Sequence, residues 1–529
     1  MRDFNKTELY EIAAAGTDKE VNDKLKMLVD VDRRAVSRKE TIGYMLFDGS
    51  TGFNVDGHQE LFNNSYIKIS LSKQSLYNAI AGVWDVVDDF LIGGLIEKTR
   101  TRWGKFVPYM FMSAVPYAAV SILYWLMPLL FSQGNLNNFD YLPKFILFCV
   151  IGMLREAIGN FKDIAKGGYL STVTPYPSDR RRLLSITNYF SIIYSRVPDL
   201  IVEFMLDFVT NGLVSTKRSS EETIGRAFMI MGPFTMVVYA GVTMWYSTIA
   251  KERVRQNIET PKILDSLKLV FSNRPVLAVF ISNALGSFGT GFSTNDYYRY
   301  VLFMTTFETI AGIPSVFFQP IGFANYNKLS KKYSTKSLYA VSQVFAKTFY
   351  IPIWFYGRFL KTKSGQPFFL NRWAMLPVTA VWECIYATFW GVRSISITEI
   401  NNEINDYIEW KCGSRNEAML SVAGTIITKI PSRINGILLP LYKKWIGFDQ
   451  EAYPKGQHQN EKAERMIFAM CTIMVSFLVL TSMIPITWYN IDKETRDRMY
   501  KELNERRAEK AEAVNAAAEN EAAEKRTEM

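Results

Sequence analysis

Histidine and cysteine are scarce in this sequence of 529 residues, which contains two histidines and four cysteines. Two histidines are too few for a histidine-based metal site. The cysteines, at positions 149, 384, 412 and 471, lie far apart and form no Cys-x-x-Cys pair, so they predict free thiols rather than a metal site or a disulfide framework. The N-terminus has no apolar run, and we therefore expect no cleaved signal peptide.

Long hydrophobic runs dominate the middle of the chain. Hydrophobic residues make up 48% of the sequence and aromatic residues 14%, and they concentrate between about residues 41 and 489, while both ends are strongly polar. Runs such as 107–131 and 466–489 contain no charged residue, and a helix needs about 20 apolar residues to cross a bilayer. The pattern predicts an integral membrane protein with several spans, surrounded by lipid.

The charge of the chain does not indicate a nucleic-acid partner. The formal net charge is +10, but the basic residues lie in short stretches between the apolar runs, as they do in the loops of membrane proteins. The sequence also contains no phosphate-binding loop, nucleotide fingerprint, HExxH motif or Ser/His/Asp set in a soluble lobe. We expect no enzyme activity and no cofactor, and we expect energy to come from an ion gradient rather than from ATP.

Twelve candidate membrane spans account for the apolar middle of the chain, and the polar connector 251–274 separates them into two sets of six. The expected parts are a polar cytoplasmic N-terminal extension (1–40), a first six-helix half (41–250), the connector, a second six-helix half (275–489) and a charged cytoplasmic tail (490–529). The predicted spans are 41–62, 74–96, 107–131, 142–166, 183–211, 227–250, 275–298, 299–324, 335–357, 368–397, 416–442 and 465–489.

The loops between these spans predict both the orientation and the fold. Basic residues are more frequent in the two tails and in the loops after even-numbered spans, which places both termini in the cytoplasm. The loops 93–105 and 320–336 each begin with a Gly-led turn and continue with a basic cluster, a weak repeat between the halves. Two related six-helix halves are the arrangement of the major facilitator superfamily, an all-α membrane fold of twelve transmembrane helices. We expect a monomer in the cell membrane.

Longer motifs carry a resemblance to one family of that superfamily. Residues 84–89 (WDVVDD) and 99–108 (TRTRWGKFVP) resemble the span-2 signature of the glycoside–pentoside–hexuronide:cation symporters, the melibiose permease-like family. Residues 406–417 (DYIEWKCGSRNE) resemble its second signature, and 169–179 resembles the stretch that follows its span 4. The resemblance covers about 41–489. It implies a symporter that moves a small-molecule sugar, glycoside or uronide together with H⁺ or Na⁺ by alternating access.

The resemblance also implies a cation site made by span-2 carboxylates, here Asp85 and Asp89, where a Na⁺ ion could bind. The residues themselves indicate the same pair, because positions i and i+4 share one helix face. A carboxylate persists in a membrane span only beside a cavity, a cation or a partner charge, so permanent interior ion pairs are the alternative. Asp88 lies off that face and is expected to be structural. Lys429 on span 11 matches a lysine of the family, and we predict that it pairs with Asp85 or Asp89 and is required for coupling.

Span 4 departs from the family pattern at Lys166. The resemblance predicts an acidic or amide cation ligand at this position, and a lysine cannot coordinate Na⁺. The Lys166 ammonium would instead repel a cation or replace it as the partner of Asp85 or Asp89. The two carboxylates remain protonatable, and burial can raise a carboxylate's pKa toward neutrality. The sequence therefore favours H⁺ over Na⁺ as the coupling ion.

Other basic and aromatic residues are candidates for substrate binding. Lys162 and Lys166 share a stripe of span 4 with Arg155, and the two lysines either extend toward the membrane surface or face the substrate. If they face the substrate, an anionic sugar such as a hexuronide is favoured over a neutral one. In the second half, a further positive charge and two indole rings on span 10 could hold a sugar ring. The predicted substrate-binding residues are Lys166, Arg393, Trp390 and Trp382.

Spans 1 and 5 are unusually polar. Residues 47–60 combine several glycines with polar side chains, which predicts a broken or cavity-lining helix. His58 in this stretch could carry a proton, although a lone histidine is more often a hydrogen-bonded structural residue. Four charged residues share one side of span 5 and predict either internal pairing or the wall of a cavity: Arg196, Asp199, Glu203 and Asp207.

Charged residues at equivalent loops of the two halves predict a cytoplasmic gate, since charge pairs there can hold one face shut. These residues are Arg100, Arg102, Asp179, Asp406 and Arg415. Two functional alternatives stay open beside sugar symport. One is transport of a lipid-like or organic-anion substrate, and the other is a non-transporting sensor that has kept the fold.

Overall fold

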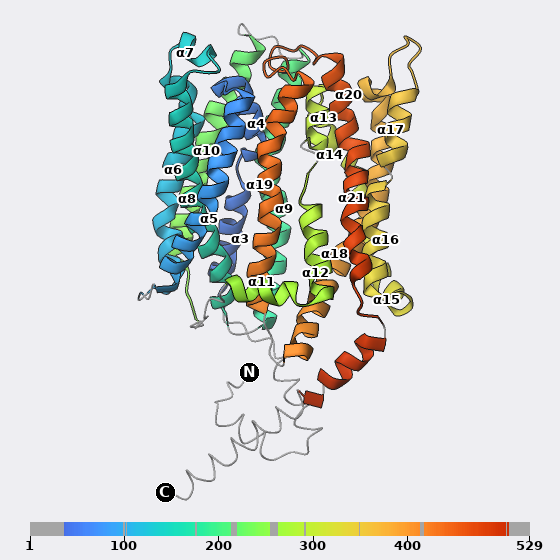
Figure 1. Cartoon of the computed structure of the whole chain (residues 1–529). Helices are drawn as coiled ribbons and strands as arrows, with labels where there is room; N and C mark the ends of the chain where they lie inside the picture. The colour runs from blue at the N-terminus through green and yellow to red at the C-terminus, as the bar shows by residue number, and fades with distance from the viewer. Residues whose placement is uncertain are drawn as a thin grey trace, which may run out of the picture. The chain divides into compact units, whose positions relative to one another are not determined.

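The computed structural model of the protein is built almost entirely from helices (Figure 1). Within the described residues there is no β-strand beyond two isolated bridges, which confirms the predicted all-α fold. The structure describes residues 36–98, 101, 103–174, 177–212, 219–253, 263–289, 292–348, 350–412, 417–492, 494–503 and 505–506.

Helices occupy each of the first six predicted spans. Spans 2 to 6 each contain one long helix, and span 1 is interrupted. The elements are α3 (Arg38–Gly52), η1 (Asp56–His58), α4 (Gln59–Phe62), η2 (Asn63–Ile67), α5 (Leu71–Lys98), α6 (Val107–Trp125), η3 (Met127–Leu130), α7 (Gln133–Asn137), α8 (Leu142–Thr172), α9 (Pro177–Thr210) and α10 (Ser220–Ile249).

The other six predicted spans are helical as well, but several are divided into shorter pieces. The connector ends in α11 (Ile263–Phe271), which precedes the first of them. The elements that follow are α12 (Arg274–Gly286), α13 (Thr294–Tyr300), α14 (Phe307–Gly312), η4 (Ile313–Phe317), α15 (Gln319–Lys332), α16 (Thr335–Thr348), α17 (Tyr350–Phe359), η5 (Phe368–Leu370), α18 (Arg372–Cys412), α19 (Glu417–Ile446), α20 (Glu461–Ala469), η6 (Met470–Met474), α21 (Val475–Met483) and η7 (Ile484–Trp488).

The break predicted in span 1 is confirmed. Helix α3 begins with a capping box, in which Ser37 and Glu40 each accept a hydrogen bond from the other's backbone N–H. It ends at Gly52, where the side chains of Ser50 and Thr51 donate to backbone carbonyls one turn earlier. Such side-chain bonds compete with the helical ladder, and glycine adds little to hold it. The chain then continues in short turns up to Ile67.

Two glycines allow α3 to lie very close to α9. A Cβ atom on Gly49 would stand 2.9 Å from the ring of Tyr194, and one on Gly52 would stand 2.7 Å from Cβ of Ser195. Any larger residue would push the two helices apart. The close approach matters for the site, because it brings the polar middle of α3 against α9.

The chain divides into two compact units. Unit 1 comprises Met1–Ile67, Val83–Val202 and Gly225–Asn257, and unit 2 comprises Lys68–Gly82, Glu203–Ile224 and Ile258–Met529. The start of α5, the end of α9 and the start of α10 therefore group with the second half of the chain. The predicted division into six-helix halves at 251–274 stays a prediction.

An aromatic cluster forms the core of unit 1 where α3, α8 and α10 meet. Phe47 of α3 stacks on Tyr246 of α10 at a centroid distance of 5.2 Å, and the Tyr246 hydroxyl donates to that of Tyr169 on α8 at 2.8 Å. All three side chains are buried. Burial of each such ring stabilises the fold by about 2–3 kcal/mol, so the cluster fixes the positions of the three helices that carry the candidate site.

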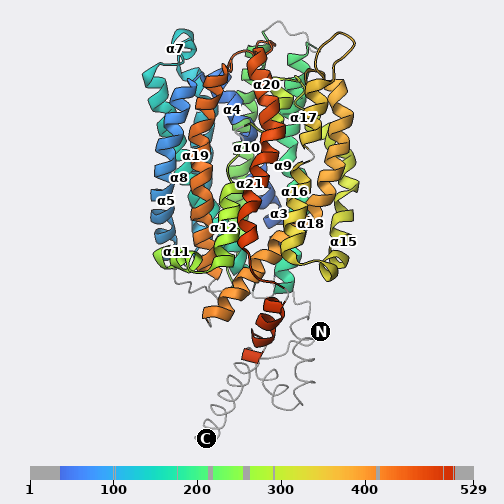
Figure 2. The ribbon, with the colours of Figure 1, turned by 45° about the vertical axis from the view of Figure 1, so that its right-hand side comes forward.

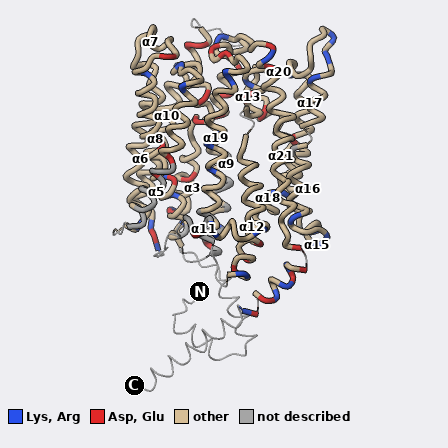
Figure 3. The backbone as a smooth tube through the Cα atoms, in the orientation of Figure 1, with Lys and Arg blue, Asp and Glu red and all other residues tan. Residues whose placement is uncertain are grey.

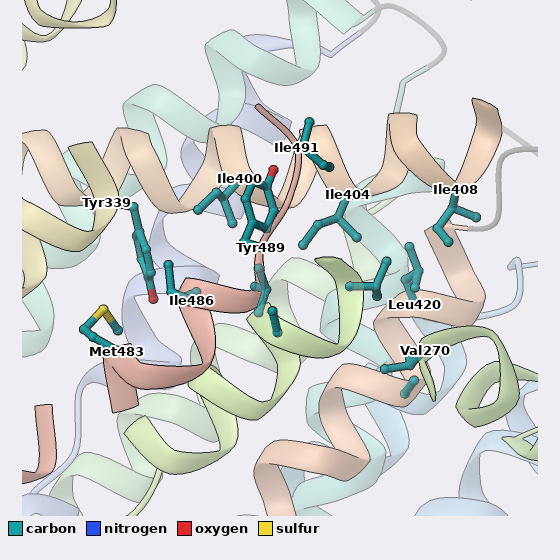
Figure 4. Packing of buried hydrophobic residues seen from close by; sticks show 14 residues of the cluster. Val270, Tyr339, Ile400, Ile404, Ile408, Leu420, Met483, Ile486, Tyr489 and Ile491 are labelled. Carbon is teal, nitrogen blue, oxygen red and sulfur yellow. The ribbon is translucent and has the colours of Figure 1, made fainter. Parts of the chain in front are cut away.

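The core of unit 2 follows one face of α18. Ile400, Ile404 and Ile408 recur at every fourth position, and Figure 4 shows them side by side with Leu420 of α19 and Tyr489 at the end of η7. Figures 1 and 2 show α15 and α16 running alongside α18. The long helix α18 is thus the central element of this unit.

The charged residues lie mainly toward the helix ends, and the helix middles are largely uncharged (Figure 3). Four helical segments of the described chain are long and apolar enough by composition to cross a membrane: Val107–Trp125, Ser220–Ile249, Arg372–Cys412 and Glu461–Trp488. Helices such as α8 and α9 carry more ionisable residues within their predicted spans. The charges inside these helices define the candidate functional site.

Candidate functional site

The predicted cation-site carboxylates lie on α5 in unit 1. Asp85 and Asp88 are both buried, whereas the side chain of Asp89 lies outside the described residues. Asn160 of α8 donates its amide to both carboxylate oxygens of Asp88 at 3.1 Å. Asp88 therefore links α5 to α8, in agreement with the structural role expected of it.

Lys166 pairs with a carboxylate of span 1. Its ammonium lies 2.7 Å from Oδ1 of Asp48 and donates to the Thr51 hydroxyl at 2.6 Å. The other oxygen of Asp48, Oδ2, accepts a hydrogen bond of 2.5 Å from the Ser191 hydroxyl on α9. Three helices, α3, α8 and α9, thus meet at one carboxylate. Sequence reasoning expected Lys166 beside Asp85 or Asp89, and the ion pair found for it is with Asp48.

A second ion pair links span 1 to span 4. The Arg155 guanidinium lies 2.6 Å from Oδ2 of Asp56, and its Nε donates to the Ser121 hydroxyl at 2.9 Å. The rings of Tyr117 and Tyr124 lie 5.8 and 5.3 Å from the guanidinium carbon. Two polar and two aromatic partners therefore hold Arg155 in place.

The third basic residue of the span-4 stripe is held locally. The Lys162 ammonium lies 3.3 Å from Oδ1 of Asp163 and 4.5 Å from the centroid of the Tyr117 ring. The cation–π contact and the neighbouring carboxylate satisfy the charge without a ligand. The predicted stripe thus divides into three basic residues, each with a different set of partners.

His58 is buried beside a carboxylate. Its Nε2 atom lies 3.7 Å from Oδ1 of Asp199 on α9, and its ring lies 6.0 Å from that of Phe228. The distance to Asp199 exceeds that of a hydrogen bond, so the contact is electrostatic. The proton-carrying role considered for His58 stays a prediction.

The candidates for sugar stacking lie on α18 in unit 2. Trp382 is buried, with its ring centroid 4.5 Å from that of Tyr350 and 5.9 Å from that of Tyr386. Trp390 is partly exposed and meets the edge of Phe323 at 6.2 Å. Arg393 is also partly exposed. Trp390 and Arg393 therefore present surface that a ligand can contact, whereas Trp382 presents little.

Lys429 lies on α19 in unit 2, where its side chain is partly buried. Asp85 belongs to unit 1. The pairing of Lys429 with a span-2 carboxylate therefore stays a prediction.

Unit 2 contains a carboxylate site that the sequence did not predict in detail. Oδ1 of Asp207 accepts from the backbone N–H and the hydroxyl of Thr305, both at 2.5 Å. Oδ2 accepts from the backbone N–H of Thr306 at 2.9 Å and from its hydroxyl at 2.5 Å. Of the two roles considered for span 5, internal pairing is the one found for Asp207, and its partners are neutral rather than basic.

Other bonds join the first-half segments of unit 2 to second-half residues. Asn211 at the end of α9 donates to the carbonyl of Phe303 and accepts from Arg372, at 2.9 and 2.6 Å. The buried Lys68 lies 2.8 Å from Glu451 and also pairs with Glu221 at 3.0 Å. Near the start of α5, the side chains of Ser75 and Asn78 donate to backbone carbonyls of α19, those of Ile437 and Gly436.

The predicted gate residues are described only in part. Arg100, Arg102 and Arg415 lie outside the described residues. Asp179 is buried and accepts a hydrogen bond of 3.0 Å from the backbone N–H of Val36. Asp406 lies near the end of α18, and burial together with this carboxylate raises the pKa of Tyr500. The role of these residues as a gate stays a prediction.

Both units are built from helices, and ion pairs lie inside the hydrophobic helices of unit 1. The sequence matches the family described as MFS/sugar transport protein over residues 46–493. The chain therefore belongs to this family of the major facilitator superfamily, as the sequence motifs predicted.

Individual relatives span nearly the whole chain. It is 21% identical over 491 residues to the uncharacterized symporter YnaJ of Bacillus subtilis (strain 168), with 89% of this chain and 96% of the relative covered. It is 23% identical over 470 residues to the inner membrane symporter YicJ of Escherichia coli (strain K12), covering 85% and 91%. For the isoprimeverose transporter of Lactiplantibacillus pentosus the identity is 22% over 489 residues, covering 90% and 94%.

A solved structure shares the fold. The crystal structure of a D-xylose-proton symporter matches with a TM-score of 0.50 at 13% sequence identity, covering 83% of this chain and 95% of that chain. At this identity the likeness concerns the arrangement of the helices alone, and it confirms the predicted major facilitator fold.

Proposed function

We propose that the protein is a secondary symporter that moves a sugar, glycoside or uronide across the cell membrane together with a cation. The observation that carries this proposal is the set of charged side chains inside the hydrophobic helices of unit 1. Asp48 of α3 pairs with Lys166 of α8, and Asp56 of η1 pairs with Arg155 of α8. Ionisable residues in membrane spans are costly and mark substrate or ion sites by default. Membership of a sugar transport family and relatives named as symporters support the same function.

H⁺ is the favoured coupling ion in this proposal. Lys166 replaces the family's span-4 cation ligand, and its ammonium already forms an ion pair with the Asp48 carboxylate. Asp85 and Asp89 on α5, with Lys429 on α19, are the proposed cation-coupling residues. Trp390 and Arg393 on α18 are proposed to contact the substrate, with Trp382 behind them.

The proposed orientation places both termini in the cytoplasm. Helix α9 then begins on the cytoplasmic side and runs 30 residues from Pro177 to Asp207, about 45 Å at the helical rise. That length exceeds the hydrocarbon thickness of about 30 Å. The Asp207 bonds to Thr305 and Thr306 therefore lie near the extracytoplasmic surface, where we infer that they act as a gate that opens to admit substrate.

Uptake into proteoliposomes tests the proposal. The purified protein is reconstituted and given radiolabelled melibiose, xylose or methyl β-D-glucuronide under an imposed pH gradient without Na⁺, or under an imposed Na⁺ gradient. Accumulation that collapses when the gradient is dissipated supports symport, and the gradient that drives it identifies the ion. Saturable binding without uptake would instead identify a sensor. Absence of both for every sugar would contradict the proposal.

A further inference from the structure

We propose that Asp48 carries the coupled proton, and that protonation of Asp48 transfers Lys166 from this carboxylate to a carboxylate of the substrate. The inference rests on the proposed function and deepens it, because it adds Asp48 and Lys166 to the span-2 and span-11 residues proposed for coupling and narrows the substrate to a sugar acid with one negative charge.

Exposure distinguishes Lys166 from the other basic residues of the span-4 stripe. The Lys166 side chain is 26% exposed, against 12% for Arg155 and 11% for Lys162. Arg155 is held by Asp56, Ser121 and two tyrosine rings, whereas the one carboxylate paired with Lys166 among the described residues is Asp48. Lys166 is therefore the cation of this stripe that a ligand can reach and that can exchange its partner.

The bonds around Asp48 allow it to take up a proton without losing a partner. Oδ1 faces the Lys166 ammonium, which can only donate, and Oδ2 faces the Ser191 hydroxyl. A hydroxyl can donate or accept. A proton that arrives from water therefore binds to Oδ2, and the new O–H donates to Ser191, whose own hydrogen turns away. The carbonyl oxygen Oδ1 keeps its hydrogen bond to Lys166 but no longer neutralises its charge.

Lys166 and several tyrosines are the ionisable side chains packed near Asp48. Lys166 faces it from α8, and the packed neighbours on α3, α9 and α10 contribute Tyr44, Tyr194 and Tyr246. On α5, Asp88 is held by Asn160 of α8. Asp48 is therefore the carboxylate at which this proposal places the coupled proton.

Protonation and substrate binding then depend on each other. An ammonium without a counter-charge is costly in this environment, and Asp56 and Asp163 are already paired with Arg155 and Lys162. A substrate carboxylate restores neutrality, so the proton and the anion each raise the affinity for the other by the same factor. One proton enters with one negative charge. When the proton leaves, Asp48 recovers Lys166 and displaces the anion, and the transport cycle is electroneutral.

The test compares two sugars of nearly the same shape, methyl β-D-glucuronide and the neutral methyl β-D-glucoside, with the full-length protein in detergent and in proteoliposomes. We expect the affinity for the glucuronide to rise as pH falls, by up to about tenfold per pH unit for one linked proton, and the affinity for the glucoside to be independent of pH. Uptake of the glucuronide should follow a pH gradient and should not respond to an imposed membrane potential.

Variants then assign the roles. Asp48→Asn should bind the glucuronide with no pH dependence and exchange it across the membrane without accumulating it. Lys166→Gln should lose at least tenfold in affinity for the glucuronide but not for the glucoside. Lys162→Gln, one turn away on the same helix, is the matched control and should change neither affinity more than about twofold. The double variant Asp48→Asn/Lys166→Gln removes both charges and serves if a single variant fails to fold; it should show no preference for the acid.

Several results would overturn the inference. Accumulation of the glucuronide by Asp48→Asn under a pH gradient would remove Asp48 from coupling. An equal loss in Lys162→Gln and Lys166→Gln would show a general effect of basic residues. Uptake of the neutral glucoside with no response to the glucuronide would contradict this inference and leave the proposed function standing, whereas failure to bind or transport any sugar would contradict both.

Discussion

Asp48 and Asp207 are two carboxylates inside the same membrane protein, and different kinds of partner stabilise their charges. Asp48 in unit 1 faces one ammonium and one hydroxyl. Asp207 in unit 2 faces four neutral donors from two consecutive threonines. Both arrangements satisfy the charge, but each oxygen of Asp207 accepts from a backbone N–H as well as from a hydroxyl, whereas Oδ2 of Asp48 faces a hydroxyl.

The difference lies in the backbone. Each oxygen of Asp207 accepts from a backbone N–H, of Thr305 on one side and of Thr306 on the other. A backbone N–H can only donate, so each oxygen of Asp207 has one partner that cannot adapt to a bound proton. The Thr305 and Thr306 hydroxyls can reverse their hydrogen bonds, as the Ser191 hydroxyl can. The two sites therefore differ in their fixed donors: a backbone N–H on each oxygen of Asp207, and a lysine ammonium on one oxygen of Asp48.

The largest expected effect comes from Lys429, the lysine proposed to pair with a span-2 carboxylate. Lys429→Ala should fold and insert but should not accumulate substrate above background, because a span-2 carboxylate would lose the partner that is exchanged during coupling. The measurement is gradient-driven uptake, with surface yield and monodispersity as the folding check. Accumulation at the parent level would exclude Lys429 from the mechanism.

A double variant extends this experiment. Lys429→Ala together with Asp85→Ala should recover thermal stability, because neither charge is then left without its proposed partner, but it should not recover accumulation. Recovery of neither would show that the two residues do not form a pair. The result would also indicate whether the charge of Asp85 is balanced by an ammonium, as that of Asp48 is, or by neutral donors, as that of Asp207 is.

Asp207→Asn is expected to have the next largest effect, on stability. Whichever way the amide turns, its NH₂ group must face the backbone N–H of Thr305 or of Thr306. An unsatisfied buried donor and the lost charge-assisted bonds cost about 2–4 kcal/mol. Asp48→Asn is the matched comparison, because the NH₂ group of the new asparagine can face the Ser191 hydroxyl. The loss in free energy of unfolding should be less than half that of Asp207→Asn. Denaturant-induced unfolding of both variants measures the difference, and equal losses would contradict the distinction between the two sites.

Arg102→Ala tests the predicted cytoplasmic gate. In the proposed orientation, this gate lies on the opposite side of the membrane from Asp207. We expect several-fold slower transport with substrate affinity within a few-fold of the parent, because a gate residue controls opening and does not contact the substrate. The rates of uptake and of equilibrium exchange are compared with the binding constant. Loss of binding in a correctly inserted protein would place Arg102 in the substrate site.

The smallest expected effect concerns the pair of His458 and Glu464, in which the histidine is the group whose protonation changes. His458 lies before α20, where its Nδ1 is 3.0 Å from Oε1 of Glu464, and this hydrogen bond raises the pKa of the histidine above 6.5. A raised pKa in the folded state stabilises the protein fully below about pH 6.5 and no longer does so once the pH exceeds the folded-state pKa. The side chain is largely exposed, so the gain is below about 1 kcal/mol.

The control for this effect is His458→Gln. The parent should be slightly more stable than the variant at pH 5.5, and the two should be equal at pH 8.5, as measured by thermal unfolding at both values. A difference that grows with rising pH would have the wrong sign and would exclude the ion pair with Glu464.

The pattern of the sequence predicted the fold more completely than the site. The apolar runs predicted the positions of most helices, and the glycines and hydroxyl residues of 47–60 predicted the break that follows α3. Two spans were misplaced: α18 continues to Cys412, well beyond the predicted end at 397, and the helices of the predicted span 299–324 run from Phe307 to Lys332. The motifs around 84–108 and 406–417 identified the family that residues 46–493 match. Asp85 is buried on α5, while its role in a cation site stays a prediction, and the structural role expected of Asp88 agrees with its bond to Asn160.

The partners of the charged residues could not be predicted in the same way. A charge in a span indicates that a partner or a cavity must exist, but it does not indicate which of several opposite charges lies near. Lys166 of α8 was expected beside span 2, and it pairs instead with Asp48 of span 1. The partners of Asp207 are neutral threonines about a hundred residues away, and no charge pattern points to them.

The sequence by itself determined that the chain is helical, that it lies in a membrane and to which family it belongs, because hydrophobic length and local motifs depend only on residues near one another in the chain. The tertiary structure alone decided which carboxylate faces an ammonium and which faces backbone N–H groups. That distinction depends on contacts between segments that are remote in sequence, which no local pattern of residues encodes.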